Sequence, residues 1–126
     1  MDKRHLKRIH TIQNLFALSF ANTVSDKLPH SDMDLTQQVL LKKEDIDAII
    51  KEYAPKYSLD KIAKIDLAIL RLAVYELKYA KQNPQKVVID EAIELAREYG
   101  SEKSYSFING ALASVVRVAA SPKSSV

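Results

Sequence analysis

The stretch IDLAILRLAVYEL, residues 65–77, decides the fold of this 126-residue chain. A helix formed by these residues is apolar on most sides, so other elements have to surround it. The chain has only two Gly and four Pro residues, and its abundant Ala, Leu, Ile, Lys and Glu favour helices over strands. We therefore expect an all-α fold around a buried central helix at residues 59–81, capped by Ser58 and stopped by Asn83-Pro84.

Four more amphipathic segments flank the central helix. They cover residues 3–24, 34–54, 86–99 and 102–120. Residues 25–33 form an expected loop, and Pro55 ends the second segment because proline cannot continue a helix. The chain is long enough to build one core, so we expect one domain over residues 1–120 and a disordered tail over residues 121–126.

Helical periodicity selects the side chains expected to face the core. In the second and fourth segments they are Leu35, Val39, Ile46, Ile50, Tyr53, Ile89, Ala92, Ile93 and Ala96. In the last segment they are Phe107, Ile108, Leu112 and Val115 or Val116. Gly100 is expected to end the fourth helix and Ser101 to cap the last one. Gly110, inside an apolar helical pattern, predicts a close contact between helices.

Charge is distributed unevenly along the chain. Residues 11–126 hold 15 basic and 15 acidic side chains, so the net charge of +3 comes from the first ten residues. The charged side chains there are Asp2, Lys3, Arg4, Lys7 and Arg8. Cations in the first turns of a helix, and like charges four residues apart, both destabilise it. Such a local conflict is typical of a binding site, and this one favours a polyanion as the ligand.

On a helical projection of residues 3–24, apolar and basic side chains fall in different sectors. The apolar stripe consists of Leu6, Ile9, Ile12, Phe16, Phe20 and Val24. The basic side chains lie in the other sector, which Thr11 and Asn14 extend. We expect this helix to bury the stripe and to offer the basic sector to solvent or to an anion.

Several classes of site and protein are excluded by composition. The absence of Cys excludes disulfides, thiolate metal sites and Cys nucleophiles. His5 and His10 are five residues apart and do not share a helix face as a metal pair would, and no Gly-rich phosphate loop is present. We therefore expect no enzyme, no cofactor and no metal. No apolar run is long enough to span a bilayer, and the N-terminus lacks the apolar core of a secretory signal, so a cytoplasmic protein is expected.

Three motifs in the second half of the chain resemble those of the NusB family. Residues 69–77 (ILRLAVYEL) resemble the family's LRxAxYEL helix, and residues 88–96 (VIDEAIELA) its V-x-I-N/D-E-A-V/I-E-L-A-K stretch. Residues 107–112 (FINGAL) are similar to its F-V-N-G-V-L. The basic start followed by residues 13–16 (QNLF) is similar to the family's arginine-rich start and Q-x-L-Y/F.

This resemblance implies a fold and a function. The fold is all-α, with five to seven helices in two small packed bundles. The function is binding of the boxA element of single-stranded RNA together with NusE, a small-subunit ribosomal protein, in RNA polymerase complexes that suppress termination and support ribosomal RNA synthesis. The same domain precedes some RNA cytosine methyltransferases, and we expect this chain not to be that variant because it ends soon after the domain.

Candidate RNA-binding residues follow from the charge pattern and the resemblance. They are Lys3, Arg4, Lys7, Arg8, Gln13, Phe16, Lys103 and Phe107. Cations contact phosphates, an amide can bond a base edge, and aromatic rings can stack on unpaired bases. The structural alternatives are a solvated terminus for the cations, a surface amide for Gln13 and core packing for the two Phe.

Candidate residues for the protein partner are Tyr75, Glu76 and Glu91. They lie in motif helices that, in the family, are at or near the NusE surface, and exposed carboxylates suit a basic partner. The structural alternative is a buried Tyr75 and an ion pair of Glu76 with Arg71 or Lys78. The alternative function is a helical protein–protein scaffold that keeps the fold and has lost RNA binding.

Overall fold

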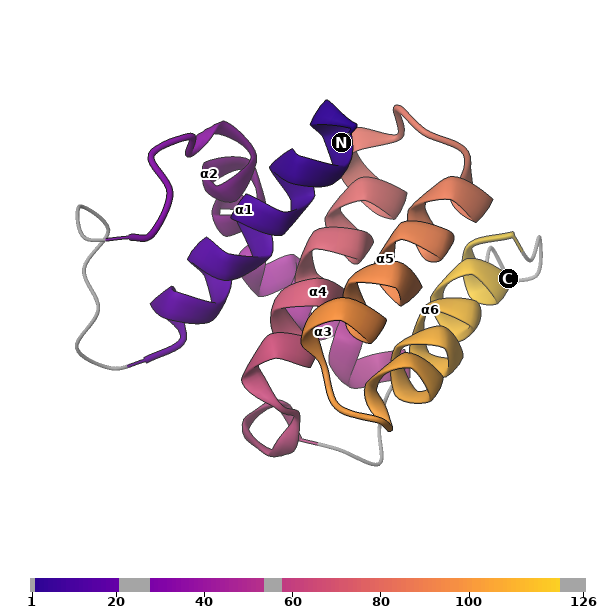
Figure 1. The fold of residues 1–126 in the computed structure, drawn as a ribbon. Helices are drawn as coiled ribbons and strands as arrows, with labels where there is room; N and C mark the ends of the chain where they lie inside the picture. Colours follow the sequence, from indigo (N-terminus) through magenta and orange to yellow (C-terminus); the bar gives the residue numbers. More distant parts are fainter. Residues whose placement is uncertain (1, 21–27, 54–57, 121–126) are drawn as a thin grey trace.

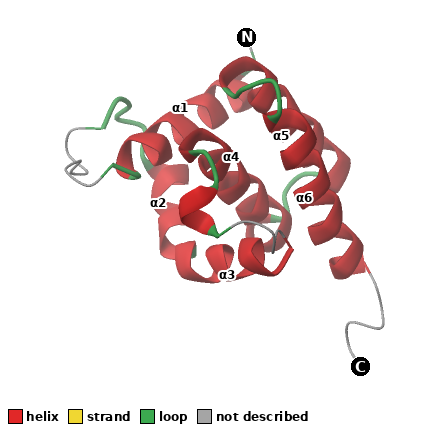
Figure 2. Cartoon of the chain, turned by 90° about the horizontal axis from the view of Figure 1, so that it is seen from below, coloured by secondary structure: helices red, strands yellow, loops and turns green. Residues whose placement is uncertain are grey.

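The computed structural model describes residues 2–20, 28–53 and 58–120, and within these ranges it contains helices and no strand (Figure 1, Figure 2). The α-helices are α1 Lys3–Leu18, α2 Asp34–Leu41, α3 Lys43–Tyr53, α4 Lys64–Tyr75, α5 Gln85–Tyr99 and α6 Ser104–Ala120. A 3-10 turn, η2 (Leu59–Lys61), precedes α4, and a π-helical turn, η3 (Glu76–Ala80), follows it. The expected all-α class is confirmed, whereas the expected tail over residues 121–126 lies outside the described residues.

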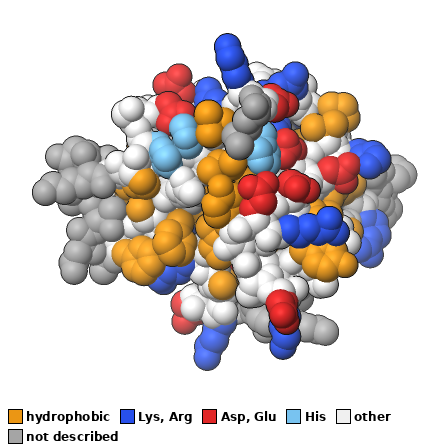
Figure 3. Space-filling view, in the orientation of Figure 1, with side chains coloured by type: hydrophobic (Ala, Val, Ile, Leu, Met, Phe, Trp, Pro, Cys, Tyr) orange, Lys and Arg blue, Asp and Glu red, His pale blue; other side chains and the backbone are white. Residues whose placement is uncertain are grey.

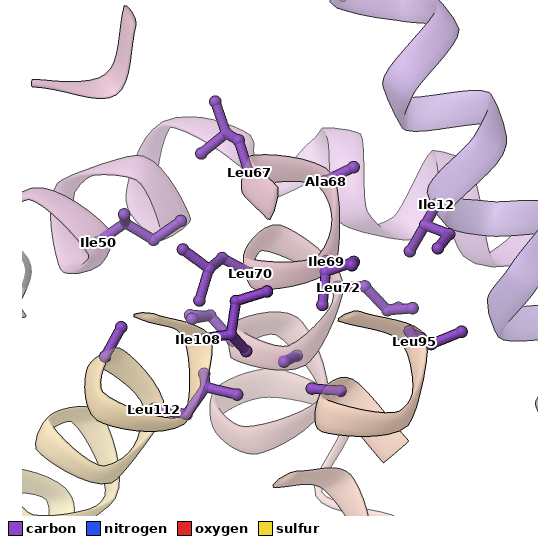
Figure 4. Close-up of a cluster of buried hydrophobic side chains, with 14 of the residues drawn as sticks. Ile12, Ile50, Leu67, Ala68, Ile69, Leu70, Leu72, Leu95, Ile108 and Leu112 are labelled. Carbon is purple, nitrogen blue, oxygen red and sulfur yellow. The ribbon is translucent and has the colours of Figure 1, made fainter. Parts of the chain in front are cut away.

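Helix α4 is the centre of the molecule, because the other five α-helices all contact it. In Figure 1, α1 and α2 lie on one side of α4, and α5 and α6 lie on the other. The buried residues of α4 are Asp66, Leu67, Ala68, Ile69, Leu70, Leu72, Ala73 and Val74. Figure 4 shows side chains of the neighbouring helices gathered around them. Burial of one Leu or Ile contributes roughly 1.5–3 kcal/mol, so the apolar side chains of α4 contribute substantially to the stability of the fold.

The central helix is shorter than expected at both ends. Ile62 has an extended backbone (φ −78°, ψ 134°), so α4 begins only at Lys64. The side chain of Ser58 makes no capping hydrogen bond in the described structure, which corrects the expected cap. At the other end, α-helical geometry stops before Glu76, and the π-helical turn that follows ends at Lys81, whose backbone is left-handed (φ 52°, ψ 30°).

The segment expected as one helix over residues 34–54 is two helices, α2 and α3. They meet at Lys42, whose backbone (φ −106°, ψ 11°) leaves the helical region, although no glycine or proline marks the position. The expected inward side chains are buried or half-buried where described: Leu35, Val39, Ile46 and Ile50. The side chain of Tyr53 and the whole of Pro55 lie outside the described residues.

Helix α1 buries a face that overlaps the expected one only in part, because Ile9 and Ile12 are buried as expected but other residues of the stripe are not. Its buried side chains are Arg8, Ile9, Thr11, Ile12, Asn14 and Leu15. Leu6, Phe16 and Phe20 were expected on the core stripe, and they are 41%, 37% and 46% exposed. Polar residues can lie on this buried face because their hydrogen bonds are satisfied by α1 itself or by neighbouring elements. Thr11, for example, donates its hydroxyl to a backbone carbonyl one turn earlier (2.8 Å).

Asn14 fixes the connection that precedes α2. Helix α1 ends at Leu18 rather than at residue 24, and the chain is described again from residue 28, so Val24 falls outside the described residues. The buried amide of Asn14 accepts a hydrogen bond from the backbone N–H of His30 (3.0 Å) and donates to the His30 carbonyl (3.2 Å). Residues 28–33 are non-helical, as expected, and these bonds tie them to α1.

Helices α5 and α6 pack against each other as a hairpin. Their buried apolar side chains are Val88, Ala92, Leu95, Ala96, Ile108, Ala111, Leu112 and Val115. The expected set is therefore largely confirmed, since its remaining members are half-buried: Ile89, Ile93, Phe107 and Val116.

Gly100 ends α5, but not through a left-handed conformation, since its φ is −93°. A larger residue would not fit at this position, because an added Cβ would lie 2.5 Å from Ser104 Oγ and 2.7 Å from the Ala96 carbonyl oxygen. Ser104 Oγ accepts the backbone N–H of Ser101 (2.8 Å), and α6 begins at Ser104. Ser101 therefore does not cap a helix that starts at residue 102.

Gly110 does not make the expected close contact between helices. It lies on an exposed face of α6, and an added Cβ would meet nothing within 4 Å in the described part of the chain. The helix continues through Asn109-Gly110 because its other faces carry the apolar residues that the core needs. The glycine itself faces outward.

Replacement of the two glycines by alanine is expected to have opposite effects on the free energy of unfolding. Gly110→Ala is expected to raise the free energy of unfolding by about 0.5–1 kcal/mol, because alanine loses less backbone entropy in a helix. Gly100→Ala is expected to lower it, because the new methyl would overlap Ser104 Oγ and a carbonyl oxygen. Urea unfolding of both variants beside the wild type measures this. A change of the same sign in both would contradict the assignment.

Candidate nucleic-acid interface

A buried ion pair joins α1 to the end of α4. Arg8 is 5% exposed and Glu76 is 8% exposed. The guanidinium of Arg8 donates from Nε and Nη2 to the two carboxylate oxygens of Glu76, at 2.8 Å each. Its Nη1 also donates to Glu91 Oε1 on α5 (3.3 Å). The hydrogen bond to Glu76, together with the negative charges of Glu76 and Glu91, raises the pKa of Arg8 despite its burial.

The position of Arg8 corrects two expectations. Arg8 was expected in a solvent-facing sector, but it lies inside because two carboxylates that are distant in the sequence meet it there. Glu76 is buried and pairs with Arg8, not with Arg71 or Lys78. Arg71 instead donates to Asp47 on α3, at 2.8 and 3.0 Å.

His5 extends this ion pair toward α5. Its Nδ1 lies 2.9 Å from Glu91 Oε2, and its Nε2 lies 3.1 Å from Glu98 Oε1. A carboxylate only accepts hydrogen bonds, so both ring nitrogens can donate at once only when the imidazole is protonated. The hydrogen bond to Glu91, with the charge of that carboxylate and of Glu98, therefore raises the pKa of His5.

A hollow of about 580 Å³ opens beside the buried pair, between α1, α2 and η3. We call it the tyrosine groove. Its polar and aromatic lining includes Arg4, Lys7, Gln38, Tyr75, Tyr79 and Asn83. Arg4 Nη1 donates to Asn83 Oδ1 (3.0 Å), and the hydroxyl of Tyr75 donates to Gln38 Oε1 (2.9 Å).

The π-helical turn η3 shapes one wall of this groove. The backbone N–H of Lys81 donates to the carbonyl of Glu76 (3.0 Å), five residues earlier, and such turns are frequent at functional sites. Tyr75 and Tyr79 lie four residues apart on this wall, with ring centroids 6.1 Å apart and an interplanar angle of 27°. Lys42 Nζ lies 5.2 Å from the centroid of the Tyr79 ring.

The tyrosine groove combines the two features that single-stranded nucleic acid needs. Arg4 and Lys7 are exposed cations on one wall, where they can meet phosphates. Tyr75 and Tyr79 are half-buried rings on the other, where bases can stack. The contribution of Tyr79 was missed from the sequence, although its spacing from Tyr75 is the signal that would have found it.

The other candidate residues of α1 lie outside the groove lining. Lys3 is exposed on the first turn. Gln13 Oε1 is hydrogen-bonded to His30 Nε2. Phe16 packs edge-on against Phe20, with ring centroids 5.1 Å apart.

Lys103 and Phe107 line a second hollow, of about 160 Å³, at the start of α4. Residues 61–63 and Asp66 complete its lining. Of the expected RNA-binding residues, Arg4, Lys7 and the buried Arg8 line the tyrosine groove, and Lys103 and Phe107 line the second hollow. The other three line neither of these two hollows.

The NusB family model matches residues 4–117 of this chain. The chain belongs to the NusB family. The family resemblance inferred from the motifs is thereby confirmed.

Two relatives show how far the similarity to NusB extends. The transcription antitermination protein NusB of Geobacillus kaustophilus is 38% identical over 123 residues, which cover 90% of this chain and 95% of that protein. The protein of the same name from Listeria monocytogenes serotype 4a is 36% identical over 122 residues, with the same coverage.

Solved structures that superpose on this chain include a NusB protein. T. maritima NusB superposes with a TM-score of 0.77 at 30% identity and covers 92% of both chains. A structure of the antitermination factors NusB and NusE in complex with dsRNA superposes with a TM-score of 0.75 at 22% identity, and the match covers 92% of this chain and 98% of that one. A structure described as a plectonemic RNA supercoil superposes with a TM-score of 0.83 at 21% identity, and the match covers 97% of this chain and 99% of that one. The last two show the shared fold.

The expectation that the chain is not an enzyme agrees with this family, whose matched members are named for transcription antitermination. Among the described residues, no helix is long and apolar enough to cross a membrane.

His5→Gln is expected to destabilise the protein more at low pH than at high pH. Because folding raises the pKa of His5, its contribution is fully present below the unfolded-state pKa of about 6.5. The contribution is lost as the pH rises through the folded-state pKa. Urea unfolding of both proteins should show a difference of about 0.5–1 kcal/mol at about pH 5.5, shrinking toward zero by about pH 8.5. A difference that is constant or grows with pH would contradict this role.

Proposed function

We propose that this chain is a cytoplasmic transcription antitermination factor that binds boxA-type single-stranded RNA together with NusE. In this role it joins RNA polymerase complexes and supports ribosomal RNA transcription. Family membership and the antitermination proteins it resembles support the proposal. The observation that carries it is the tyrosine groove, where exposed cations face a pair of aromatic rings.

In this proposal, Arg4 and Lys7 hold the RNA backbone, with Lys3 on the same helix as a further phosphate contact. Phosphate contacts position a nucleic acid without reading its sequence. Tyr75 and Tyr79 stack on unpaired bases, and this wall of the groove can accept any base. The amides of Gln38 and Asn83 are the groups in the groove that can bond base edges. Arg8 acts as a positioning residue, since its donors are occupied by carboxylates.

Lys103 and Phe107 supply a second contact with the RNA in this proposal. The ammonium group of Lys103 is exposed, and Phe107 is half-buried beside it in the second hollow. Gln13 and Phe16 lie outside the proposed RNA path because the Gln13 amide oxygen is already bonded to His30 and Phe16 packs on Phe20.

NusE is proposed to dock on the outer face of α5. Acidic side chains gather over this helix (Figure 3), and Asp90, Glu94 and Glu98 recur every four residues, so they form one exposed row. Glu91 lies beside the row and is half-buried by its contacts with His5 and Arg8. A basic ribosomal protein complements such a row. Of the three residues first expected at this interface, Glu76 is inside the protein and Tyr75 lies in the tyrosine groove.

Lys7→Ala tests the phosphate contact, and Lys51→Ala on the exposed face of α3 is its matched control. Binding of labelled boxA-like RNA, measured by fluorescence anisotropy with NusE present, is expected to weaken for Lys7→Ala alone. The slope of log affinity against log salt should become shallower by about 0.7 for each phosphate that the protein no longer neutralises. Equal binding by both variants would overturn the groove as the RNA site. NusE binding with no RNA binding at all would favour the scaffold alternative.

Tyr79→Ala tests stacking separately from charge. It is expected to weaken RNA binding by about 1–3 kcal/mol, the contribution of one base stacked on an aromatic ring, while the salt slope stays that of the wild type. Tyr79→Phe keeps the ring and is expected to bind normally. Weak binding by Tyr79→Phe as well would show that the hydroxyl, not the ring face, makes the contact.

Glu94→Lys tests the NusE surface, with Glu44→Lys on α3 as the matched charge reversal. Calorimetric titration with NusE is expected to show weaker binding for Glu94→Lys only, with the difference reduced at high salt because the attraction is screened. Its binding to RNA without NusE should not weaken. If both reversals bind NusE equally well, the acidic row of α5 is not the docking surface.

A further inference from the structure

Three side chains with metal-binding atoms converge near the middle of α1. His10 lies on α1, and His30 and Asp32 lie in the connection before α2. One potential ligand atom from each residue lies within 4.8 Å of the other two. Histidine side chains are visible at the surface over α1 in Figure 3. The sequence showed no such cluster, because His30 is 20 residues from His10 and only the fold brings them together.

The two imidazole rings are held side by side. The rings of His10 and His30 stack with centroids 3.8 Å apart and an interplanar angle of 11°. The buried Asn14 bonds both the backbone N–H and the carbonyl of His30, so the position of that residue does not depend on its own side chain. Asn14 also donates to Thr36 Oγ1 at 3.3 Å, which fixes the start of α2 to the same point. A site supported in this way is largely preorganised.

The hydrogen bonds leave a free lone pair on His30. Its Nε2 contacts Gln13 Oε1, and an amide oxygen only accepts, so Nε2 carries the proton. In the neutral ring, Nδ1 then carries the lone pair that a metal requires. A metal-bound histidine typically donates its other ring N–H to a carbonyl oxygen in this manner, and Gln13 already provides that oxygen.

The spacing of His10 and Asp32 also suits a metal ion. His10 Nδ1 lies 3.0 and 3.2 Å from the two carboxylate oxygens of Asp32. Two ligands that are each about 2.0–2.1 Å from a tetrahedral zinc ion lie about 3.3 Å apart. A metal ion can therefore replace the proton that these two groups share with little movement. Only the His30 ring has to approach, since one of its nitrogens already lies within 4.8 Å of the other two ligand atoms.

We propose that His10, His30 and Asp32 bind one divalent transition metal ion of the zinc class. Two imidazole nitrogens and one carboxylate oxygen are the ligands, and water completes the tetrahedron. Two nitrogen donors of three favour zinc, cobalt or nickel over calcium or magnesium, which prefer oxygen. The ion cross-links α1 to the connection before α2. It thus stabilises the fold by an amount that rises with the logarithm of the metal concentration above the dissociation constant, independently of RNA and NusE.

Zinc titration of the full chain, without a histidine tag and stripped with a chelator, tests this site by calorimetry. One saturable site is expected. His10→Gln, His30→Gln and Asp32→Asn should each weaken it by about tenfold or more. His5→Gln is the matched control, because His5 also lies on α1 beside carboxylates, and it should bind zinc as the wild type does.

Two further measurements keep the test independent of folding defects in the variants. In the wild-type protein, zinc should shift the imidazole NMR signals of His10 and His30 and leave those of His5 in place. Zinc should also raise the thermal midpoint of the wild type but not of Asp32→Asn, a change of an exposed side chain. The absence of saturable binding, equal binding by Asp32→Asn, or a shift confined to His5 would each overturn the proposal.

Discussion

Arg8 and Glu76 are both taken out of water, and the relative placement of α1 and α4 depends on the ion pair between them. Burial of either charge alone is costly, so loss of one partner is expected to destabilise a protein by about 3–5 kcal/mol, whereas replacement of both by apolar residues can be neutral. The pair therefore contributes less to net stability than to geometry. Both buried charges are satisfied in the register of α1 on α4 that places Arg8 opposite Glu76, so the pair favours that register.

That register creates the tyrosine groove. Arg4 lies one helical turn before Arg8, and Lys7 directly precedes it, so both are set at the rim when Arg8 is fixed inside. Tyr75 directly precedes Glu76, and Tyr79 follows within the π-helical turn. One buried ion pair thus places cations from α1 opposite one aromatic ring at the end of α4 and another in the π-helical turn η3.

The architecture was accessible from sequence because it depends on apolar periodicity, which is local. The central helix over residues 65–77 and the inward faces of α5 and α6 were predicted on this basis. The burial of Arg8 on α1 was not, because Arg8 is separated from Glu76 and Glu91 by 68 and 83 residues. A helical projection places every cation outside, because it contains no information about carboxylates on other helices. The prediction of a close helix contact at Gly110 was wrong for a related reason. A glycine within a helix can lie against a neighbouring helix or face solvent, and the local sequence does not distinguish the two positions.

The same interactions limit what the basic N-terminus can do alone. Its net charge of +3 overstates the charge available to a ligand, because Arg8 is neutralised by Glu76 and Glu91. Lys3, Arg4 and Lys7 remain at the surface, and the only guanidinium among them already donates to Asn83. Ammonium groups bind phosphate as point charges without the bidentate geometry of arginine. The proposed contact at this end of the molecule therefore positions RNA through its backbone, and the choice of sequence has to come from the amide-bearing wall of the groove and from the surface that NusE adds.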